Sequence, residues 1–171
     1  AKAVENPVTS SGALVYSGKG ARNAAYKGEK MQKQKVCLLG GVRIPFCRVE
    51  TQYAELGVLE LMVAALKGLV QRYGLEGRTL GEVALGAVIV PSRIWNFSRD
   101  AAIRSGLSLE TPAVTVGRAC GTSLEAASSI AAKIASGHIQ VGIAGGADSM
   151  SDIPLTLKRT LARRILKTSR A

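Results

Sequence analysis

Val116-Gly117-Arg118-Ala119-Cys120-Gly121-Thr122-Ser123-Leu124-Glu125-Ala126-Ala127 is the segment from which the architecture of this chain is inferred. A strand-like apolar run, 113–116, leads into it, and an alanine-rich helical run follows it. Cys120 is therefore expected at the first turn of a buried helix, where unpaired N–H groups and the helix dipole favour a thiolate. Such a thiolate is a candidate covalent nucleophile. A small buried cysteine at a strand–helix junction is the alternative interpretation, and this segment alone leaves both open.

Strands and helices alternate along the chain on either side of this segment. Apolar runs bounded by Gly or Pro predict strands over 36–40, 82–90, 113–116 and 140–144. Apolar spacings of three and four predict helices over 54–73, 99–105 and 121–136. The alternation predicts an α/β fold with a mostly parallel sheet and right-handed crossovers. The helix over 121–136 is apolar nearly all round, so it should be buried on most sides, which one domain of this size cannot provide.

The net charge of +11 over 171 residues is concentrated at the two ends. Residues 1–35 hold seven basic and two acidic side chains, and residues 154–171 hold six basic and none acidic, whereas the middle is balanced. A hydrophobic content of 47% is typical of a globular domain. Aromatic residues make up only 4%, which argues against a base-stacking nucleic-acid surface. No apolar run is long enough to predict a membrane span.

Three segments follow from this distribution. Residues 1–35 show no apolar period and are interpreted as a basic, disordered extension, a transit-peptide remnant being one of several possible origins. Residues 36–153 are the folded domain. Residues 154–171 form a basic amphipathic stretch with Leu157, Leu161 and Ile165 at four-residue spacing. Its apolar stripe is expected to pack on another part of the protein, and the alternative is a surface for anionic lipid.

The three cysteines form no Cys-x-x-Cys pair, which indicates free thiols in a reducing compartment and no metal site. Cys37 lies in an apolar strand and is expected in the core, and Cys47 is expected to be an ordinary loop residue. His138, the only histidine, follows Ser136-Gly137 and is interpreted as a residue at the C-terminus of the preceding helix rather than as a catalytic base.

Several motifs occur together in one order. They are Arg43-Ile44-Pro45-Phe46, Gly86-Ala87-Val88, Ser98-Arg99-Asp100-Ala101-Ala102, the Cys120 segment, Ala144-Gly145-Gly146, and Ser149-Met150-Ser151-Asp152. In this order the chain resembles the N-terminal half of a thiolase over about residues 36–165. The tail Ser151-Asp152-Ile153-Pro154-Leu155, followed by a basic run, is similar to the long-chain 3-ketoacyl-CoA thiolases, including the β-subunits of the fatty-acid oxidation complex.

The resemblance implies a thiolase-like fold, in which two βαβαβ-type halves pack around a central helical layer, with one half present here. It implies thiolytic cleavage of a 3-ketoacyl-CoA in fatty-acid β-oxidation, with Cys120 as the acylated nucleophile. Coenzyme A would be a co-substrate, with no permanently bound cofactor. By the resemblance, the histidine base, the second cysteine and most CoA-contacting residues are expected beyond Ala171.

The resemblance also bears on three further residues and on partners. Arg118 is expected to lower the pKa of Cys120 or contact a dimer partner, Asn96 to cap a loop, and Asp148 to accept structural hydrogen bonds. A homodimer or larger assembly, a complex with a hydratase/dehydrogenase subunit, and peripheral contact with an anionic membrane are implied, and nucleic acid is not. The implied location is intracellular, cytoplasmic in a bacterium and mitochondrial in a eukaryote.

Two other functions stay open at this point. Ketosynthase-like condensing enzymes share the cysteine–helix–Gly-Gly core, and they would differ in the second half. A non-catalytic, truncated thiolase-like module that dimerises or docks through its basic ends is the other alternative.

Overall fold

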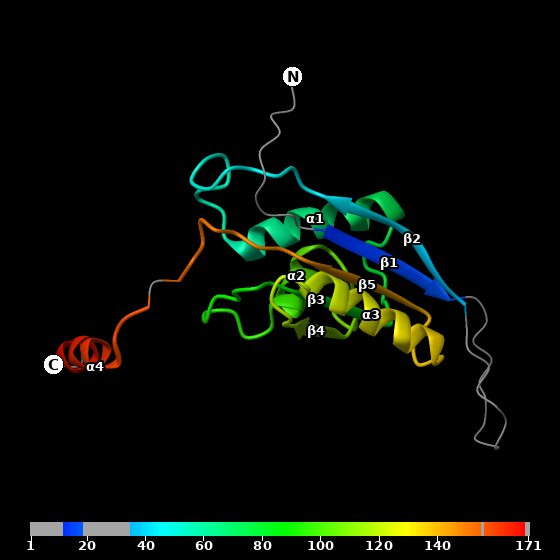
Figure 1. Cartoon of the computed structure of the whole chain (residues 1–171). Helices are drawn as coiled ribbons and strands as arrows, with labels where there is room; N and C mark the ends of the chain where they lie inside the picture. Colours follow the sequence, from blue (N-terminus) through cyan, green and yellow to red (C-terminus); the bar gives the residue numbers. More distant parts are fainter. Residues whose placement is uncertain (1–11, 19–34, 155, 170–171) are drawn as a thin grey trace, which may run out of the picture.

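The computed structural model describes residues 12–18, 35–154 and 156–169, and within them one five-stranded sheet carries the fold. The strands lie in the order β2-β1-β5-β3-β4 (Figure 1). β3, β4 and β5 pair in parallel, and β1 pairs antiparallel with both of its neighbours. Their bounds are Gly12–Gly18 (β1), Val36–Arg43 (β2), Glu82–Gly86 (β3), Ala113–Val116 (β4) and Val141–Gly146 (β5).

Helices cover both faces of this sheet, as the alternating pattern predicts. The described helices are α1 (Val58–Tyr73), α2 (Phe97–Arg104), α3 (Thr122–Ala135) and α4 (Arg159–Thr168). Successive residues of β3 point to opposite faces, so Val83 and Leu85 join a core with α1 and α2, whereas Ala84 joins a second core with α3. The α/β prediction is confirmed, including parallel strands that alternate with helices.

The α3 face of the sheet is lined by small residues. Ala84 and Ala144 pack there against Ala126, Ile130 and Ile134. A Cβ built on Gly142 would lie 2.9 Å from Ile130 Cγ2, so glycine lets the helix approach the strand closely. This close packing positions the N-terminus of α3 over the ends of β3 and β5.

Only one face of α3 is buried within the described residues. Thr122, Ala126 and Ile130 are buried, whereas Leu124 is 73% exposed. The expectation that this apolar helix is buried on most sides thus requires a covering layer in addition to the described residues. That covering layer stays a prediction.

The N-terminal segment differs from its interpretation as a disordered extension. Residues 12–18 form β1, an interior strand of the sheet, while the remainder of 1–34 lies outside the described residues. The prediction that Cys37 lies in the core is wrong, because its strand β2 is at the edge of the sheet and Cys37 is exposed beside Leu38 and Leu39. A continuous apolar run indicated a strand correctly but overstated its burial.

The largest boundary differences from expectation are at α1 and β3. α1 begins at Val58 rather than at residue 54, after the N-cap Gly57. β3 ends at Gly86, and the apolar residues Val88 and Ile89 that follow are exposed in a loop. The third helix and the last strand lie within one or two residues of their predicted ends.

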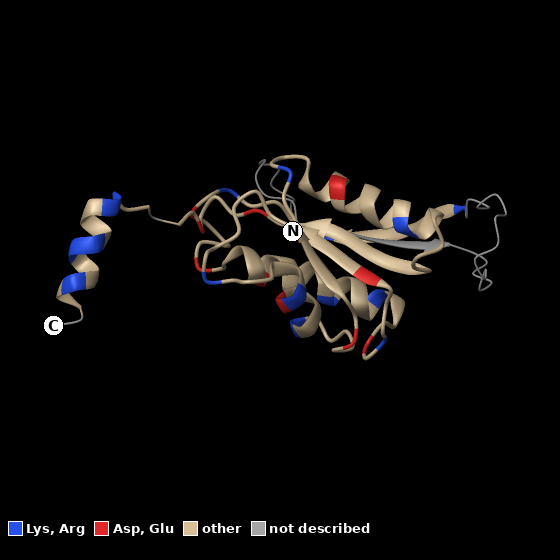
Figure 2. Cartoon of the chain, turned by 90° about the horizontal axis from the view of Figure 1, so that it is seen from below, with Lys and Arg blue, Asp and Glu red and all other residues tan. Residues whose placement is uncertain are grey.

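The basic stretch near the C-terminus contains α4, which lies apart from the sheet (Figure 1). Lys and Arg residues recur along it (Figure 2). None of its residues is buried, and Leu161 and Ile165 are about half exposed, at 47% and 50%. Across the part of the chain that the structure describes, no helix has the length and apolar character to cross a bilayer.

Candidate active site

Cys120 lies in the short turn that joins β4 to α3. The helix begins at Thr122 with Gly121 as its N-cap, so Cys120 immediately precedes the cap instead of lying in the first turn. Its side chain is exposed, which argues against the alternative interpretation of a small buried cysteine. The positive end of the α3 dipole still lies next to it, which favours a negative charge there.

The backbone of this turn is strained. Ala119, directly before Cys120, has φ +42°, a left-handed conformation that non-glycine residues rarely adopt. Two backbone hydrogen bonds close the turn, from Gly121 N–H to Arg118 O at 2.9 Å and from Thr122 N–H to Ala119 O at 3.1 Å. Strained residues of this kind cluster at functional sites, where the surrounding structure holds them in place.

Thr122 supplies the side-chain part of that support. Its Oγ1 accepts a hydrogen bond from Arg118 N–H at 2.8 Å and donates one to Ala119 O at 2.8 Å. The residue is only 3% exposed, so its hydroxyl depends on these partners. The hydroxyl is therefore hydrogen-bonded to both residues that precede Cys120, Arg118 and Ala119.

Glycines at two strand ends let the start of α3 pack on the sheet. A Cβ on Gly86 would overlap Val116 O and lie 2.5 Å from Thr122 Cγ2. A Cβ on Gly146 would lie 2.5 Å from Ser123 Oγ and 2.8 Å from Gly86 O. The last residues of β3 and β5 thus pack directly against the first turn of α3.

Arg118 forms an ion pair with Glu125, one turn into α3. Both side chains are partly exposed, 70% for Arg118 and 38% for Glu125. This carboxylate offsets the charge that the guanidinium would otherwise present to a neighbouring thiolate. The arrangement favours a structural role for Arg118 over direct activation of Cys120.

Asp148 and Asn96 are hydrogen-bonded in the loops near the sheet, as expected. Asp148 Oδ1 accepts from Val88 N–H at 2.6 Å, and burial raises the pKa of Asp148 while backbone hydrogen bonds oppose that rise. Asn96 caps α2 by accepting from Arg99 N–H at 3.0 Å, and its Oδ1 also accepts from Thr115 Oγ1 at 2.9 Å. Both residues therefore organise loops.

His138 lies at the opposite end of α3 from Cys120. It is exposed, and its backbone N–H donates to Lys133 O at 2.9 Å just past the helix C-terminus. The 14-residue helix separates the two side chains by roughly 20 Å, at about 1.5 Å per residue. The structure thus does not bring the only histidine to the thiol.

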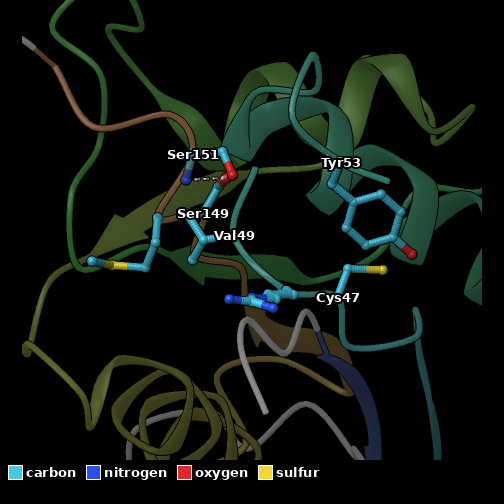
Figure 3. A pocket seen from close by; sticks show the side chains of 7 residues that line it. Cys47, Val49, Tyr53, Ser149 and Ser151 are labelled. Atoms are coloured by element: carbon cyan, nitrogen blue, oxygen red, sulfur yellow. Dashed lines mark hydrogen bonds between the residues drawn. The ribbon is translucent and has the colours of Figure 1, made fainter. Parts of the chain in front are cut away.

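A small cavity elsewhere contains Cys47. Its volume is about 10 Å³, the room of one water, and its lining comes from 47–49, Tyr53 and 149–151 (Figure 3). Cys47 and Tyr53 face each other there, and burial raises the pKa of Tyr53, with the Cys47 thiol raising it further. Cys120 is not among the lining residues, so this cavity is separate from the candidate nucleophile. In 12–18, 35–154 and 156–169 no cluster of three His, Cys, Asp or Glu residues could hold a metal ion.

Thr122 had no predicted role of its own, and Gly86 was identified only as part of the motif Gly86-Ala87-Val88. A threonine at a helix start is a signal for side-chain to backbone hydrogen bonding, and it was available in Gly121-Thr122. The packing role of Gly86 has no local signal, because it depends on Val116 and Thr122 across the packed interface.

Comparisons with known proteins agree with this arrangement. The chain matches the family described as "Thiolase, N-terminal domain" over residues 36–170. A 3-ketoacyl-CoA thiolase of Photorhabdus laumondii is 34% identical over 140 residues, which cover 82% of this chain and 32% of that protein. A 3-ketoacyl-CoA thiolase of Vibrio cholerae is 32% identical over 137 residues, 80% of this chain and 32% of that protein.

A solved structure shows the same fold. The crystal structure of the Bacillus anthracis acetyl-CoA acetyltransferase superimposes with a TM-score of 0.61 at 31% identity, covering 66% of this chain and 28% of that one. The chain therefore spans about a third of the length of the relatives it matches. Because the family match includes most of the described sheet, all four described helices and the Cys120 turn, the chain belongs to the thiolase family.

Proposed function

We propose that the protein this chain represents is an acyltransferase that cleaves 3-ketoacyl-CoA with coenzyme A, in fatty-acid β-oxidation, through an acyl-Cys120 intermediate. One observation carries this proposal: an exposed thiol on a strained, hydrogen-bonded turn at the N-terminus of α3, inside the matched family domain. The names of the Photorhabdus and Vibrio relatives, 3-ketoacyl-CoA thiolases, support the substrate class. The basic run after Ser151–Leu155 supports a long-chain type.

The proposed reaction has two steps. The Cys120 thiolate attacks the 3-keto carbon, and the bond between C2 and C3 then breaks. The electron pair goes to C2, which takes a proton and leaves as acetyl-CoA, while the acyl group stays on Sγ as a thioester. The thiol of a second coenzyme A loses its proton, attacks that carbonyl and carries the acyl group away, regenerating the thiolate.

Proton transfers in this scheme need a base and an acid near Sγ. His138 is at the wrong end of α3, and Asp148 is engaged by Val88. We therefore assign these roles to groups outside the described residues, and we expect the 171-residue chain by itself to turn over slowly or not at all. Steady-state thiolysis by the purified chain at ordinary enzyme rates would contradict this expectation.

Intact-mass analysis after incubation with a long-chain 3-ketoacyl-CoA tests the nucleophile. Cys37 is a matched control because its thiol is also exposed, but on the edge strand β2. We expect one acyl adduct that is lost in Cys120→Ser and kept in Cys37→Ser. An adduct that persists in Cys120→Ser overturns the assignment.

A second measurement covers the case in which no adduct forms. Iodoacetamide labelling is followed by peptide mass, with Cys37 as the internal reference for an exposed thiol. We expect Cys120 to react faster than Cys37, because the positive end of the α3 dipole lies beside Cys120, whereas Cys37 lies on the edge strand β2. If Cys120 reacts no faster than Cys37 and takes no adduct, the chain is a non-catalytic module.

We further propose that α4 packs its apolar stripe on another part of the full-length protein or on a partner subunit, in a homodimer or a larger complex. The exposed Leu161 and Ile165 support this, because amphipathic helices usually bury such a stripe. Co-sedimentation with phosphatidylglycerol vesicles, against phosphatidylcholine vesicles, tests the membrane alternative. Binding that is lost in Arg163→Gln/Arg164→Gln would favour lipid contact over protein packing.

A further inference from the structure

Ser98, in the first turn of α2, is a polar residue within the larger hydrophobic core. Its exposed fraction is 0%, and its chain neighbour Phe97 and its hydrogen-bond partner Leu85 are buried as completely. A hydroxyl group in such surroundings costs free energy unless it is hydrogen-bonded. The partners of the Ser98 hydroxyl therefore indicate what this residue does.

The Ser98 hydroxyl lies between two neighbouring strands. Its Oγ accepts a hydrogen bond from Leu85 N–H of β3 at 3.0 Å. The same Oγ lies 2.9 Å from Leu85 O and 2.7 Å from Val114 O of β4, and either carbonyl can accept its single proton. β3 and β4 pair in parallel at this point, with Leu85 as the register partner of Thr115. One side chain thus bonds the backbones of both strands.

The backbone of Ser98 makes a further bond to β4. Its N–H donates to Thr115 Oγ1 at 3.1 Å, and Thr115 Oγ1 donates in turn to Asn96 Oδ1 at 2.9 Å. The N–H groups in the first turn of a helix have no partner within that helix, so this bond satisfies one such group of α2. The start of α2 is thereby bonded to β4 through both the backbone and the side chain of Ser98.

These bonds lie one register step before the residues that support the Cys120 turn. The next pair along β3 and β4 is Gly86 with Val116, and Gly86 packs closely against Thr122. The Thr122 hydroxyl is in turn bonded to the two residues before Cys120. Because α2 and α3 cover opposite faces of the sheet, Ser98 and Thr122 contact this end of the two strands from opposite sides. The relative position of β3 and β4 therefore sets the position of the Cys120 turn.

We propose that Ser98 is a positioning residue for Cys120. Its hydroxyl fixes the ends of β3 and β4 relative to each other, and through Thr122 this holds the thiol beside the N-terminus of α3. The effect of a helix dipole falls off within one turn, so displacement of the Cys120 turn weakens the effect of α3 on the thiol. The inference rests on the proposed role of Cys120 as the nucleophile.

Alanine variants of two buried serines of the α2 region test this role. Ser105, at the C-terminal end of α2, is 5% exposed, and its Oγ donates to Ala102 O of the same helix at 2.8 Å. Ser98→Ala and Ser105→Ala each remove one buried hydroxyl, so both should lose stability in urea unfolding. Iodoacetamide labelling followed by peptide mass gives the ratio of the alkylation rates of Cys120 and Cys37. We expect Ser98→Ala to lower this ratio by about twofold or more and Ser105→Ala to leave it unchanged.

Hydrogen exchange in residues 117–123 is a second readout from the same variants. The bonds that close the turn, from Gly121 N–H and Thr122 N–H, should open more often in Ser98→Ala, so these amides should exchange faster. Ser105→Ala should keep the exchange rates of the unchanged protein there. An unchanged alkylation ratio in Ser98→Ala overturns the inference, and so does an equal fall of the ratio in Ser105→Ala, since that would reflect a general loss of stability.

A second pair of variants applies if Ser98→Ala does not fold. Thr115→Val removes the acceptor for Ser98 N–H, whereas Thr115→Ser keeps it in a smaller side chain. We expect Thr115→Val to lower the ratio of Cys120 to Cys37 alkylation and Thr115→Ser to keep it. Equal ratios in these two variants overturn the inference. The ratio in the unchanged protein tests the proposed function separately, so either proposal can fail alone.

Discussion

Asp148 and Val88 join the loop after β5 to the loop after β3, through a 2.6 Å hydrogen bond from Val88 N–H to Asp148 Oδ1. The carboxyl group is partly buried there, and this burial raises its pKa above the ordinary value of 3.8 despite the hydrogen bonds from Val88 and Ile89. Folding therefore favours the protonated form of Asp148. The bond between the two loops is consequently sensitive to pH.

The first prediction concerns the pH dependence of unfolding. A group whose pKa is raised by folding contributes stability that is fully present below the unfolded value and is lost as pH rises through the folded value. We expect the free energy of unfolding of Asp148→Asn, relative to the unchanged protein, to increase as pH rises upward from about 3.8, because Asn cannot ionise. Urea titrations at several pH values measure this difference. A difference that stays constant with pH would contradict the prediction.

The second prediction concerns the hydroxyl that supports the Cys120 turn. Thr122→Val keeps the shape of the side chain but removes the acceptor for Arg118 N–H and a donor to Ala119 O. We expect a loss of about 0.5–1.5 kcal/mol in the free energy of unfolding, because two part-buried hydrogen bonds of the turn are removed. We also expect slower alkylation of Cys120 relative to Cys37.

Thr122→Ser is the matched control, since it retains the hydroxyl and loses only the methyl group that lies near Gly86. It should keep the alkylation ratio of the unchanged protein. If Val and Ser variants alkylate alike, the hydroxyl does not organise the turn.

The sequence predicted the parallel part of the fold because its signals are local. Apolar runs and helical spacings over 82–146 each lie within one element, and every strand and helix expected there is present. β1 carried only a short signal, the four apolar residues 13–16, which lie within a basic segment rich in Gly and Ser, and its partner β5 is more than 120 residues away. Pairing at that separation depends on the assembled sheet and not on the residues of the strand.

The candidate site likewise combines features that have a local sequence signal with features that have none. Cys120 was identified from its position between a strand and a helix, which is a local pattern. The exposure of its side chain was not predicted, because exposure depends on what covers the N-terminus of α3. Similarly, Cys37 was expected in the core because the apolar run around it resembles a buried strand, whereas its place at the sheet edge follows from the strand order.

The third prediction concerns the contact between β3 and the first turn of α3. Gly86→Ala forces a Cβ into Val116 O and close to Thr122 Cγ2. We expect a loss of about 1–3 kcal/mol in the free energy of unfolding, as for other overpacked cores. Gly117→Ala is the control from the same region, because nothing lies within 4 Å of its Cβ position. That variant should change stability by at most about 0.5 kcal/mol, and equal losses in both would refute the packing argument.

The fourth prediction explains why α1 begins later than its sequence pattern indicated. Asp152 Oδ2 accepts from Val58 N–H at 3.0 Å, so the start of α1 is capped by a residue 94 positions away. Asp152 also pairs with Arg93 at 3.3 Å, but the Arg93 side chain is 62% exposed. Caps typically contribute about 1 kcal/mol, whereas exposed ion pairs contribute between nothing and about 1 kcal/mol. The cap should therefore be the larger of the two contributions.

Three variants separate these contributions in urea unfolding. We expect Asp152→Ala to lose about 1 kcal/mol or more, since both the cap and the ion pair are removed. Asp152→Asn retains an oxygen that can accept from Val58 N–H, so its loss should be smaller. Arg93→Ala leaves the cap intact and should cost the least. If Arg93→Ala destabilises as much as Asp152→Ala, the ion pair and not the cap determines where α1 begins.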